Sequence, residues 1–113
     1  MPKIYHIASH SDWSTQQNAS EFTAESLESE GFIHASNADQ IVDTANLIFS
    51  GRDDLLILTI DPDQLTSPVK EEDLYGHGAH PHIYGPINRP AILSSTDFPC
   101  SPDGTFSLPE LLP

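Results

Sequence analysis

The sequence predicts a small α+β domain, and three observations support that class. The length of 113 residues suits one domain with a single hydrophobic core. Five or six short segments have the composition of β-strands. The helical patterns gather in the first half of the chain and do not alternate regularly with the strands, which is typical of α+β rather than α/β folds.

The first strand is expected over residues 3–9, a β-rich run. Side chains alternate between the faces of a strand, so His6 shares a face with Ile4 and Ala8. A polar ring on an otherwise apolar face needs a hydrogen-bonding partner or costs free energy. His6 is therefore either a half-buried histidine bonded to backbone or part of a polar cleft.

Two short helical segments are expected next. Residues 10–18 have the composition of a helical turn, with Ser11 or Asp12 as its cap. Residues 21–30 carry apolar side chains toward the core, through a second short helix. Gly31 suits the end of that helix, because glycine tolerates the left-handed cap conformation.

A strand over residues 32–35 leads into the best-defined helix of the chain. We expect Ser36 or Asn37 to open this helix and Gly51 to close it. Its support is one apolar stripe at helical spacing, made by Ile41, Ala45, Ile48 and Phe49.

The second half of the chain is predicted to be mostly strand. The near-continuous apolar run at 55–60 favours a central strand that is covered on both faces. Weaker strands are expected at 69–75, 82–84 and 91–95, with a loop at 76–81 and a connecting turn at 86–90.

We expect residues 1–96 to form the domain and residues 97–113 to form a tail. The tail contains Pro99, Pro102, Pro109 and Pro113, which favour irregular structure. It is therefore predicted to lie as a proline-rich segment on the surface.

The excess of acidic over basic residues excludes some classes of binding partner. Four Lys and Arg residues stand against 17 Asp and Glu residues, for a formal net charge of -13. That excess repels phosphates and anionic membranes, so neither generic nucleic-acid binding nor a membrane partner is expected. A small nucleotide-like molecule is the expected ligand, and the oligomeric state is left open.

The cysteine content and the apolar runs bear on the compartment. Cys100 is the single cysteine, which excludes an intramolecular disulfide and a cysteine-based zinc cluster. The first residues lack the apolar core of a signal peptide, and the longest apolar run is too short to span a bilayer. A cytoplasmic location is the expectation.

His34 and Ser36 lie two residues apart and so share a strand face. Ser36 has a structural alternative as the cap of the following helix. His34 precedes the expected helix start, where free backbone N–H groups and the helix dipole suit a phosphate.

His82 and Tyr84 also share a strand face, and a tyrosine ring can stack on a flat ligand. The alternative is a structural turn anchored by the tyrosine. Arg89 follows closely and could meet a phosphate or carboxylate bidentately. Glu71 and Glu72 point to opposite faces of a strand, so at most one of them faces a cleft.

The spacing of His77, His80 and His82 also suggests a metal site. The intervening glycines and proline leave the loop geometry open, and zinc usually needs three or four ligands of fixed geometry. We expect no metal.

Several strings of the chain form one recognisable set. They are IYHI at 4–7, Trp13, SLESEGFIHAS at 26–36, Gln40, Ala45-Asn46, LLILTID at 55–61, VKE at 69–71 and PHIYGPIN at 81–88. Together they resemble a bacterial family called domain of unknown function 952, and the resemblance runs from about Ile4 to Ser95.

That family is similar to a reduced ADP-ribosyltransferase fold, which includes the RNA 2'-phosphotransferases. The resemblance implies a mostly antiparallel split sheet with two or three helices, and a cleft that holds NAD or ADP-ribose. It implies that His6 binds a ribose hydroxyl and that His34 and Ser36 contact the nicotinamide side. The third position, a glutamate in many transferases, stays open between Glu71, His82 and Tyr84.

A site with histidines in place of that glutamate resembles the 2'-phosphotransferases more closely than the other transferases. The predicted catalytic residues are His6, His34, His82 and Tyr84, and the predicted ligand-binding residues are Ser36, Asn37, Glu71 and Arg89. The expected function is transfer from NAD or ADP-ribose, with NAD as the cofactor. The alternatives are a non-catalytic nucleotide or ADP-ribose binding module and a metal-dependent hydrolase.

Overall fold

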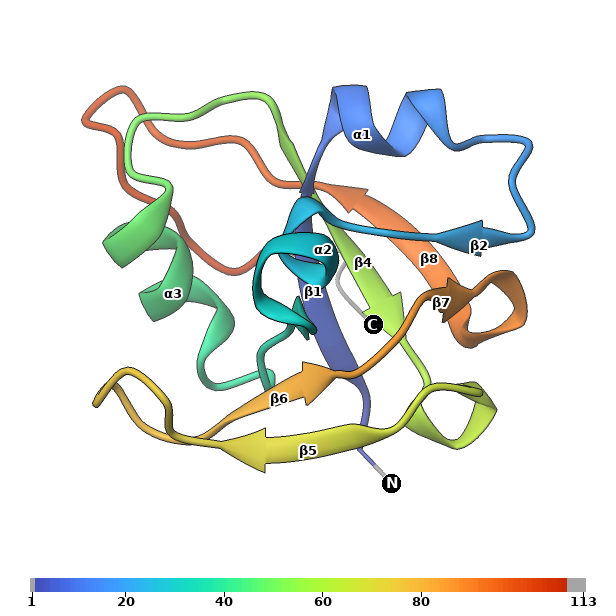
Figure 1. The fold of residues 1–113 in the computed structure, drawn as a ribbon. Helices are drawn as coiled ribbons and strands as arrows, with labels where there is room; N and C mark the ends of the chain where they lie inside the picture. Colours follow the sequence, from blue (N-terminus) through green and yellow to red (C-terminus); the bar gives the residue numbers. More distant parts are fainter. Residues whose placement is uncertain (1, 110–113) are drawn as a thin grey trace.

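The largest sheet is built around β4 (Leu55–Ile60), in which every residue is buried. In the computed structural model, which describes residues 2–109, β4 pairs antiparallel with β1 (Ile4–Ser9) and β8 (Ile92–Asp97). Figure 1 shows β4 running between these two neighbours. The near-continuous apolar sequence of β4 is therefore that of a central strand covered on both faces, as predicted.

A second sheet places β6 (His80–Ile83) between β3 (Ile33–His34) and β5 (Val69–Glu72). One antiparallel bridge joins it to the first sheet. The Tyr5 N–H donates to the Ser36 carbonyl at 2.9 Å, and the Ser36 N–H donates to the Tyr5 carbonyl at 2.7 Å. The sheet is thus split, and His6 on β1 lies beside β3.

A third, two-stranded sheet pairs β2 (Glu21–Phe22) with β7 (Ile87–Asn88). The described residues also form three α-helices and two short 3-10 helices. They are α1 (His10–Thr15), α2 (Glu25–Glu30), α3 (Ile41–Ile48), η1 (Pro62–Gln64) and η2 (Arg89–Ala91). The predicted α+β class is confirmed, with all strand pairs antiparallel in residues 2–109.

The core has two parts, which lie against opposite faces of β1. Ile4 and Ala8 belong to one buried cluster, and Tyr5 belongs to the other. This is the alternation that the sequence predicted for residues 3–9. It places His6, on the face of Ile4 and Ala8, at the edge of the larger cluster.

The first helix begins at His10, as predicted, but it ends at Thr15 and its cap differs. Ser9 is its N-cap, because the Ser9 hydroxyl accepts a hydrogen bond from the Asp12 N–H at 3.0 Å. The prediction that Ser11 or Asp12 caps this helix is wrong, since β1 runs directly into α1. The segment 21–30 begins as strand and turns helical only in α2, which ends at Gly31 with φ of 90°, as predicted.

The prediction that Ser36 or Asn37 opens the long helix is also wrong. Both backbone groups of Ser36 are used by Tyr5 in the bridge, which keeps this residue extended. Asn37 then turns the chain, and its N–H donates to the Gln40 side chain at 3.0 Å. α3 starts only at Ile41, so the free helix start expected next to His34 is not there.

α3 also ends earlier than predicted, at Ile48 rather than Gly51. Ile41 and Ala45 of the predicted apolar stripe are fully buried, and Phe49 is partly buried. Ile48 differs, because it is 64% exposed. Its side chain lies at the mouth of the cleft described below.

The weaker strands of the second half are shifted from their predicted bounds. β6 begins at His80, inside the predicted loop, and β5 ends at Glu72 instead of continuing to Tyr75. The predicted turn at 86–90 contains the short strand β7 and the start of η2.

The C-terminal segment is irregular as predicted, but its apolar side chains are core. Phe98 is fully buried and Phe106 is 5% exposed, with their ring centroids 4.8 Å apart. The expectation of a segment lying merely on the surface is wrong for these residues, because two phenyl groups complete the cluster around Tyr5. The last part of that prediction, 110–113, lies outside the described residues. Within residues 2–109, none of the helices has the length and apolar character needed to cross a membrane.

Candidate functional site: a histidine-lined cleft

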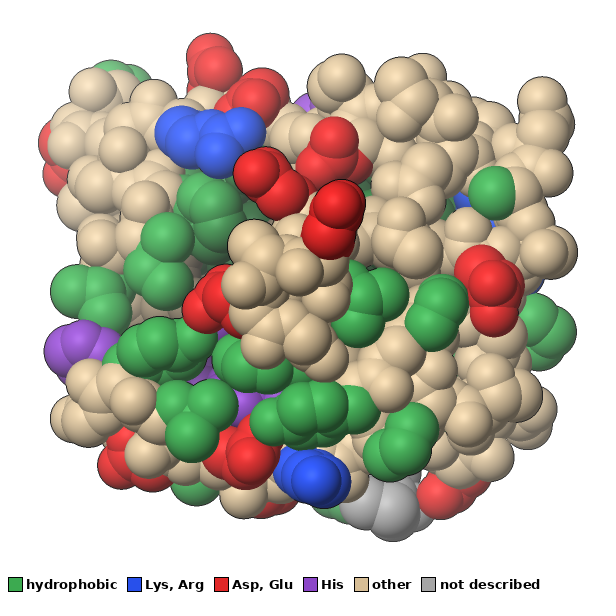
Figure 2. Space-filling view, in the orientation of Figure 1, with side chains coloured by type: hydrophobic (Ala, Val, Ile, Leu, Met, Phe, Trp, Pro, Cys, Tyr) green, Lys and Arg blue, Asp and Glu red, His purple; other side chains and the backbone are tan. Residues whose placement is uncertain are grey.

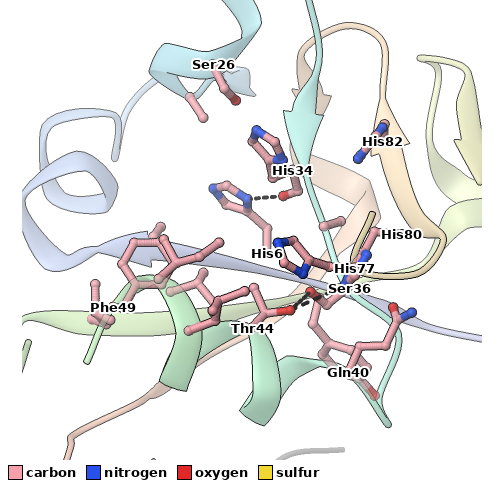
Figure 3. Close-up of a pocket in the computed structure, with 18 of the residues that line it drawn as sticks. His6, Ser26, His34, Ser36, Gln40, Thr44, Phe49, His77, His80 and His82 are labelled. Atoms are coloured by element: carbon pink, nitrogen blue, oxygen red, sulfur yellow. Dashed lines mark hydrogen bonds between the residues drawn. The ribbon is translucent and has the colours of Figure 1, made fainter. Parts of the chain in front are cut away.

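A cleft of about 1140 Å³ opens between α2, α3 and the hairpin of β5 and β6. β1 and the segment 34–36 form its floor. Figure 2 shows hydrophobic and histidine side chains gathered on this face, with acidic side chains around them. Figure 3 shows the rings of His6, His34 and His77 near the centre, between Ser26 on one wall and Thr44 on the other.

His6 lies at the floor of this cleft and is 6% exposed. Its Nδ1–H donates to the His34 carbonyl oxygen at 2.6 Å, because a carbonyl can only accept. The proton of a neutral ring is thereby fixed on Nδ1, and Nε2 keeps its lone pair. Nε2 makes no hydrogen bond to any of residues 2–109.

Burial lowers the pKa of His6 below its ordinary value of 6.5, and the nearby His34 ring acts in the same direction. The bond to the His34 carbonyl and the charge of Asp12 oppose this shift without cancelling it. His6 is therefore neutral at pH 7. It presents a hydrogen-bond acceptor to a ligand from a largely desolvated position.

The His34 side chain is held by Glu30, the last residue of α2 and four residues earlier in the chain. The His34 Nε2–H donates to a Glu30 carboxylate oxygen at 2.8 Å, and the Tyr75 hydroxyl donates to the other oxygen. These two bonds, with the tyrosine bond the stronger influence, lower the pKa of Glu30. The same bond to Glu30 raises the pKa of Tyr75. Unlike His6, the His34 side chain is 44% exposed.

His82 repeats this arrangement on the neighbouring strand. Its Nδ1–H donates to Glu72 Oε1 at 3.1 Å, and the Tyr84 hydroxyl donates to the same oxygen. The Tyr84 bond first, and the His82 bond second, lower the pKa of Glu72. Glu72 in turn raises the pKa of Tyr84. His82 is only 2% exposed, so its ring is a wall of the cleft rather than a mobile side chain.

The strand register brings the two histidine and glutamate pairs together. His34 and His82 face one another across β3 and β6, with ring centroids 5.6 Å apart. Phe32 lies against both rings, stacked on His82 at 4.2 Å and edge-on to His34 at 4.9 Å. The three histidines on which the sequence prediction rests therefore converge on one cleft.

The wall opposite these histidines is polar and well ordered by hydrogen bonds. The Ser36 hydroxyl donates to Thr44 at 3.3 Å, and Thr44 lies 3.4 Å from the His80 Nε2. The Gln40 side chain donates to the Ala79 carbonyl at 2.6 Å. These contacts hold α3 against the β5–β6 hairpin, which fixes the width of the cleft at that end.

The mouth of the cleft carries apolar side chains that face solvent. Leu47 is 62% exposed, Ile48 is 64% exposed and Tyr75 is 54% exposed. Exposed apolar side chains that meet around a polar pocket are typical of a ligand-binding surface.

One predicted catalytic residue, Tyr84, lies just outside the cleft and acts on it only through its bond to Glu72. Ser36 is buried, lines the cleft and bonds to Thr44, and it does not cap α3.

Three predicted ligand-binding residues are placed elsewhere. Asn37 and Glu71 bond to each other at 3.3 Å and do not line the cleft. Arg89 lies over the Trp13 ring at 4.5 Å and donates to the carbonyls of Gln16 and Ala19. The expectation that Arg89 meets a ligand phosphate is wrong, because its guanidinium is used to fasten the loop after α1.

The carboxylates that hold the histidines were not among the predicted site residues. Of the adjacent pair Glu71 and Glu72, Glu72 faces the cleft, and Glu30, bonded by Tyr75, holds His34. The sequence marks neither Glu72 nor Tyr75. Glu72 lies opposite His80 only through the register of β5 and β6, and the position of Tyr75 depends on the path of the 73–79 loop.

In the part of the chain that the structure describes, no three or more His, Cys, Asp or Glu side chains form a group that could hold a metal ion. His77 and His80 line the cleft, but His80 is engaged by Thr44 and by the Gly78 carbonyl.

An α+β domain with a split antiparallel sheet and a histidine-lined cleft is the class that this fold defines. The chain belongs to a family described as a protein of unknown function (DUF952), whose model matches residues 7–95. The domain of unknown function 952 predicted from the sequence strings is confirmed.

The fold is similar to that of protein CC0527 from Caulobacter crescentus. Its crystal structure is 28% identical in sequence, with a TM-score of 0.83 and coverage of 94% of each chain. Its solution structure is 28% identical, with a TM-score of 0.80, and covers 93% of this chain and 91% of that one. None of the curated proteins compared matches this chain.

Proposed function

We propose that this protein binds an N-ribosyl ligand in the histidine-lined cleft and transfers its ribosyl group, with NAD the ligand that the resemblance to ADP-ribosyltransferases suggests. The observation that carries the proposal is the unpartnered Nε2 of His6. It is a fixed acceptor, from a ring that is 6% exposed, on the floor of the cleft.

A ribose hydroxyl is the ligand group that suits such an acceptor. The hydroxyl donates to Nε2 of His6, while the backbone carbonyl of His34 holds the ring on its other side. His82 offers a second such nitrogen, because Glu72 occupies its Nδ1–H. The flat base lies toward the exposed side chains of Tyr75 and Ile48 at the mouth.

The cleft also suits the charge that develops when an N-ribosyl bond breaks. The bond between C1' and the base nitrogen opens, and its electron pair leaves with the base. A pyridinium base becomes neutral in this step and needs no proton. The ribose becomes an oxocarbenium-like cation, which the carboxylates of Glu30 and Glu72 stabilise through space.

The acceptor is then activated by His34. Glu30 accepts a hydrogen bond from the Nε2–H of His34, so Nδ1 of His34 is the nitrogen that can accept a proton. His34 is more suitable than His6 or His82 because 44% of its side chain is exposed, which lets an acceptor reach it. The acceptor oxygen bonds to C1', and its proton passes to His34. Water is the acceptor when no other is supplied.

Release of nicotinamide from NAD, followed by chromatography, tests the proposal. We expect release by the protein and a loss of about 100-fold or more in His34→Ala, the range for removing a general base. His10→Ala is the matched control, because His10 is an exposed histidine outside this cleft, paired with Asp97. It should release nicotinamide as the unchanged protein does.

A second function, binding without turnover, is distinguished by calorimetry on the same proteins. Binding of NAD or ADP-ribose with no product over days would replace the transferase by a non-catalytic binding module. Equal activity in His34→Ala and the unchanged protein would contradict the role of His34. If neither ligand nor a free N-ribosyl nucleoside binds, the whole proposal fails.

A further inference from the structure

The charges that line the cleft are almost all negative. Five of the described lining residues are carboxylates and one is a cation. The carboxylates belong to Asp12, Glu25, Glu30, Asp43 and Glu72, and the cation is Arg52. An acidic lining by itself does not define a ligand, but here it surrounds the unpartnered nitrogen of the buried His6.

The remaining cations are not placed to neutralise a phosphate in the cleft. Arg52 is engaged bidentately by Asp54, with N–O distances of 3.0 and 2.7 Å. Lys70 lies over the Tyr84 ring at 4.8 Å, and Arg89 lies over Trp13. Lys3, the fourth Lys or Arg of the chain, does not line the cleft.

The helix starts offer no phosphate seat either. Each of the three α-helices already carries an acidic residue in its first turn, at Asp12, Glu25 and Asp43. These carboxylates lie where an anion would have to bind, and they line the cleft. Residues 2–109 therefore place neither a free cation nor an unoccupied helix N-terminus where it could bind the phosphate that the sequence predicted next to His34.

We propose that the substrate is an N-ribosyl nucleoside with a positively charged base and no phosphate, rather than a dinucleotide. This inference rests on the proposed function and narrows its substrate class. The Nε2 atom of His6 on the floor and the Nε2 atom of His82 on the wall accept hydrogen bonds from the ribose hydroxyls. The carboxylates attract the cationic base, and the exposed Tyr75 ring at the mouth gives it a cation–π contact.

Calorimetry with three probes tests the substrate class: nicotinamide riboside, which is cationic and lacks phosphate, inosine, which is neutral, and NAD. We expect nicotinamide riboside to bind at least tenfold more tightly than NAD at low ionic strength. Inosine should fall between them. Added salt should weaken the binding of nicotinamide riboside and strengthen that of NAD, because it screens attraction and repulsion alike.

Two matched double variants test whether the carboxylates that line the cleft cause the preference for nicotinamide riboside. The double variant Asp12→Asn with Asp43→Asn removes two lining carboxylates and should reduce the preference for nicotinamide riboside several-fold. The control, Asp39→Asn with Asp53→Asn, removes two exposed carboxylates outside the cleft and leaves the preference unchanged. Circular dichroism of both checks that the fold is retained.

The outcomes separate this inference from the proposed function. If NAD binds as tightly as nicotinamide riboside and releases nicotinamide faster, the charge argument is overturned while the transferase stands. An equal effect of the two double variants would also overturn it, since net charge alone would then be the cause. If no ribosyl probe binds, both the substrate class and the proposed function are overturned.

Discussion

The Nδ1 atom of His6 lies 2.6 Å from the backbone carbonyl oxygen of His34. One hydrogen bond thus links two residues from separate strands, and it fixes which nitrogen of His6 carries the proton. Ser36 sits two residues further along and closes the same junction through its bridge to Tyr5. The chemistry assigned to the cleft depends on this short stretch of backbone pairing.

The first prediction concerns the free nitrogen of His6. In His6→Asn the side-chain amide can still donate to the His34 carbonyl, but nothing occupies the position of Nε2. We expect binding of a ribosyl ligand to weaken about tenfold or more, while thermal unfolding changes little. In His6→Phe the buried carbonyl also loses its donor, and the free energy of unfolding should fall by about 1–3 kcal/mol.

Calorimetry and urea unfolding of the two variants separate these effects. Unimpaired ligand binding in His6→Asn would show that Nε2 does not contact the ligand.

The second prediction follows from the lowered pKa of His6. The folded protein binds a proton at His6 less readily than the unfolded chain does. His6 therefore leaves the free energy of unfolding unchanged above the ordinary pKa of 6.5. Below 6.5 the free energy of unfolding decreases as the pH falls toward the lowered pKa of the folded state. For one proton the slope cannot exceed about 1.4 kcal/mol per pH unit.

Urea unfolding between pH 7.5 and 5.5 (a window set at about one unit on either side of the ordinary value) measures this slope. His6→Asn should flatten it, whereas the exposed His77→Asn should leave it unchanged. A slope that is the same in both variants would show that His6 is not the group that titrates.

The third prediction concerns Glu72 and its two donors. Its lowered pKa means that its bonds stabilise the folded state above the ordinary value of 4.5, and that this contribution is lost as the pH falls through the lowered value. Replacing the charge in Glu72→Gln should let the pKa of Tyr84 return toward 10. Ultraviolet titration of phenolate formation detects this change, and Tyr84→Phe assigns it. A titration curve for Glu72→Gln identical to that of the unchanged protein would contradict the bond.

The fourth prediction tests whether the C-terminal segment is core. Phe98→Ala removes a fully buried ring and should cost about 3–5 kcal/mol of unfolding free energy. Leu108→Ala in the same segment is the control, because Leu108 is 53% exposed and should cost little. Urea unfolding with fluorescence from Trp13 measures both. Equal, small losses would show that the segment is peripheral.

Local pattern was sufficient for much of the fold. The apolar run of β4 and the alternation of β1 determine which face each side chain takes, and neither depends on distant residues. The pattern failed where tertiary pairing decides. Ser36 looks like a helix cap in sequence, yet Tyr5 uses both of its backbone groups.

The candidate site divides in the same way. His6, His34 and His82 stood out because a polar ring on a strand needs an explanation. Their carboxylate partners could not be found, since Glu72 and His82 meet only through the register of β5 and β6. Arg89 was misplaced because its partners are backbone carbonyls of the loop after α1, which no side-chain pattern reveals.

Nitrogen-15 NMR of the histidine rings, with and without nicotinamide riboside, tests the proposed role of His6 most directly. We expect free His6 to carry its proton on Nδ1 at pH 7, and its Nε2 resonance to move to a hydrogen-bonded position when the nucleoside is added. A proton on Nε2 in the free protein, or an Nε2 resonance that saturating nucleoside leaves in place, would contradict that role.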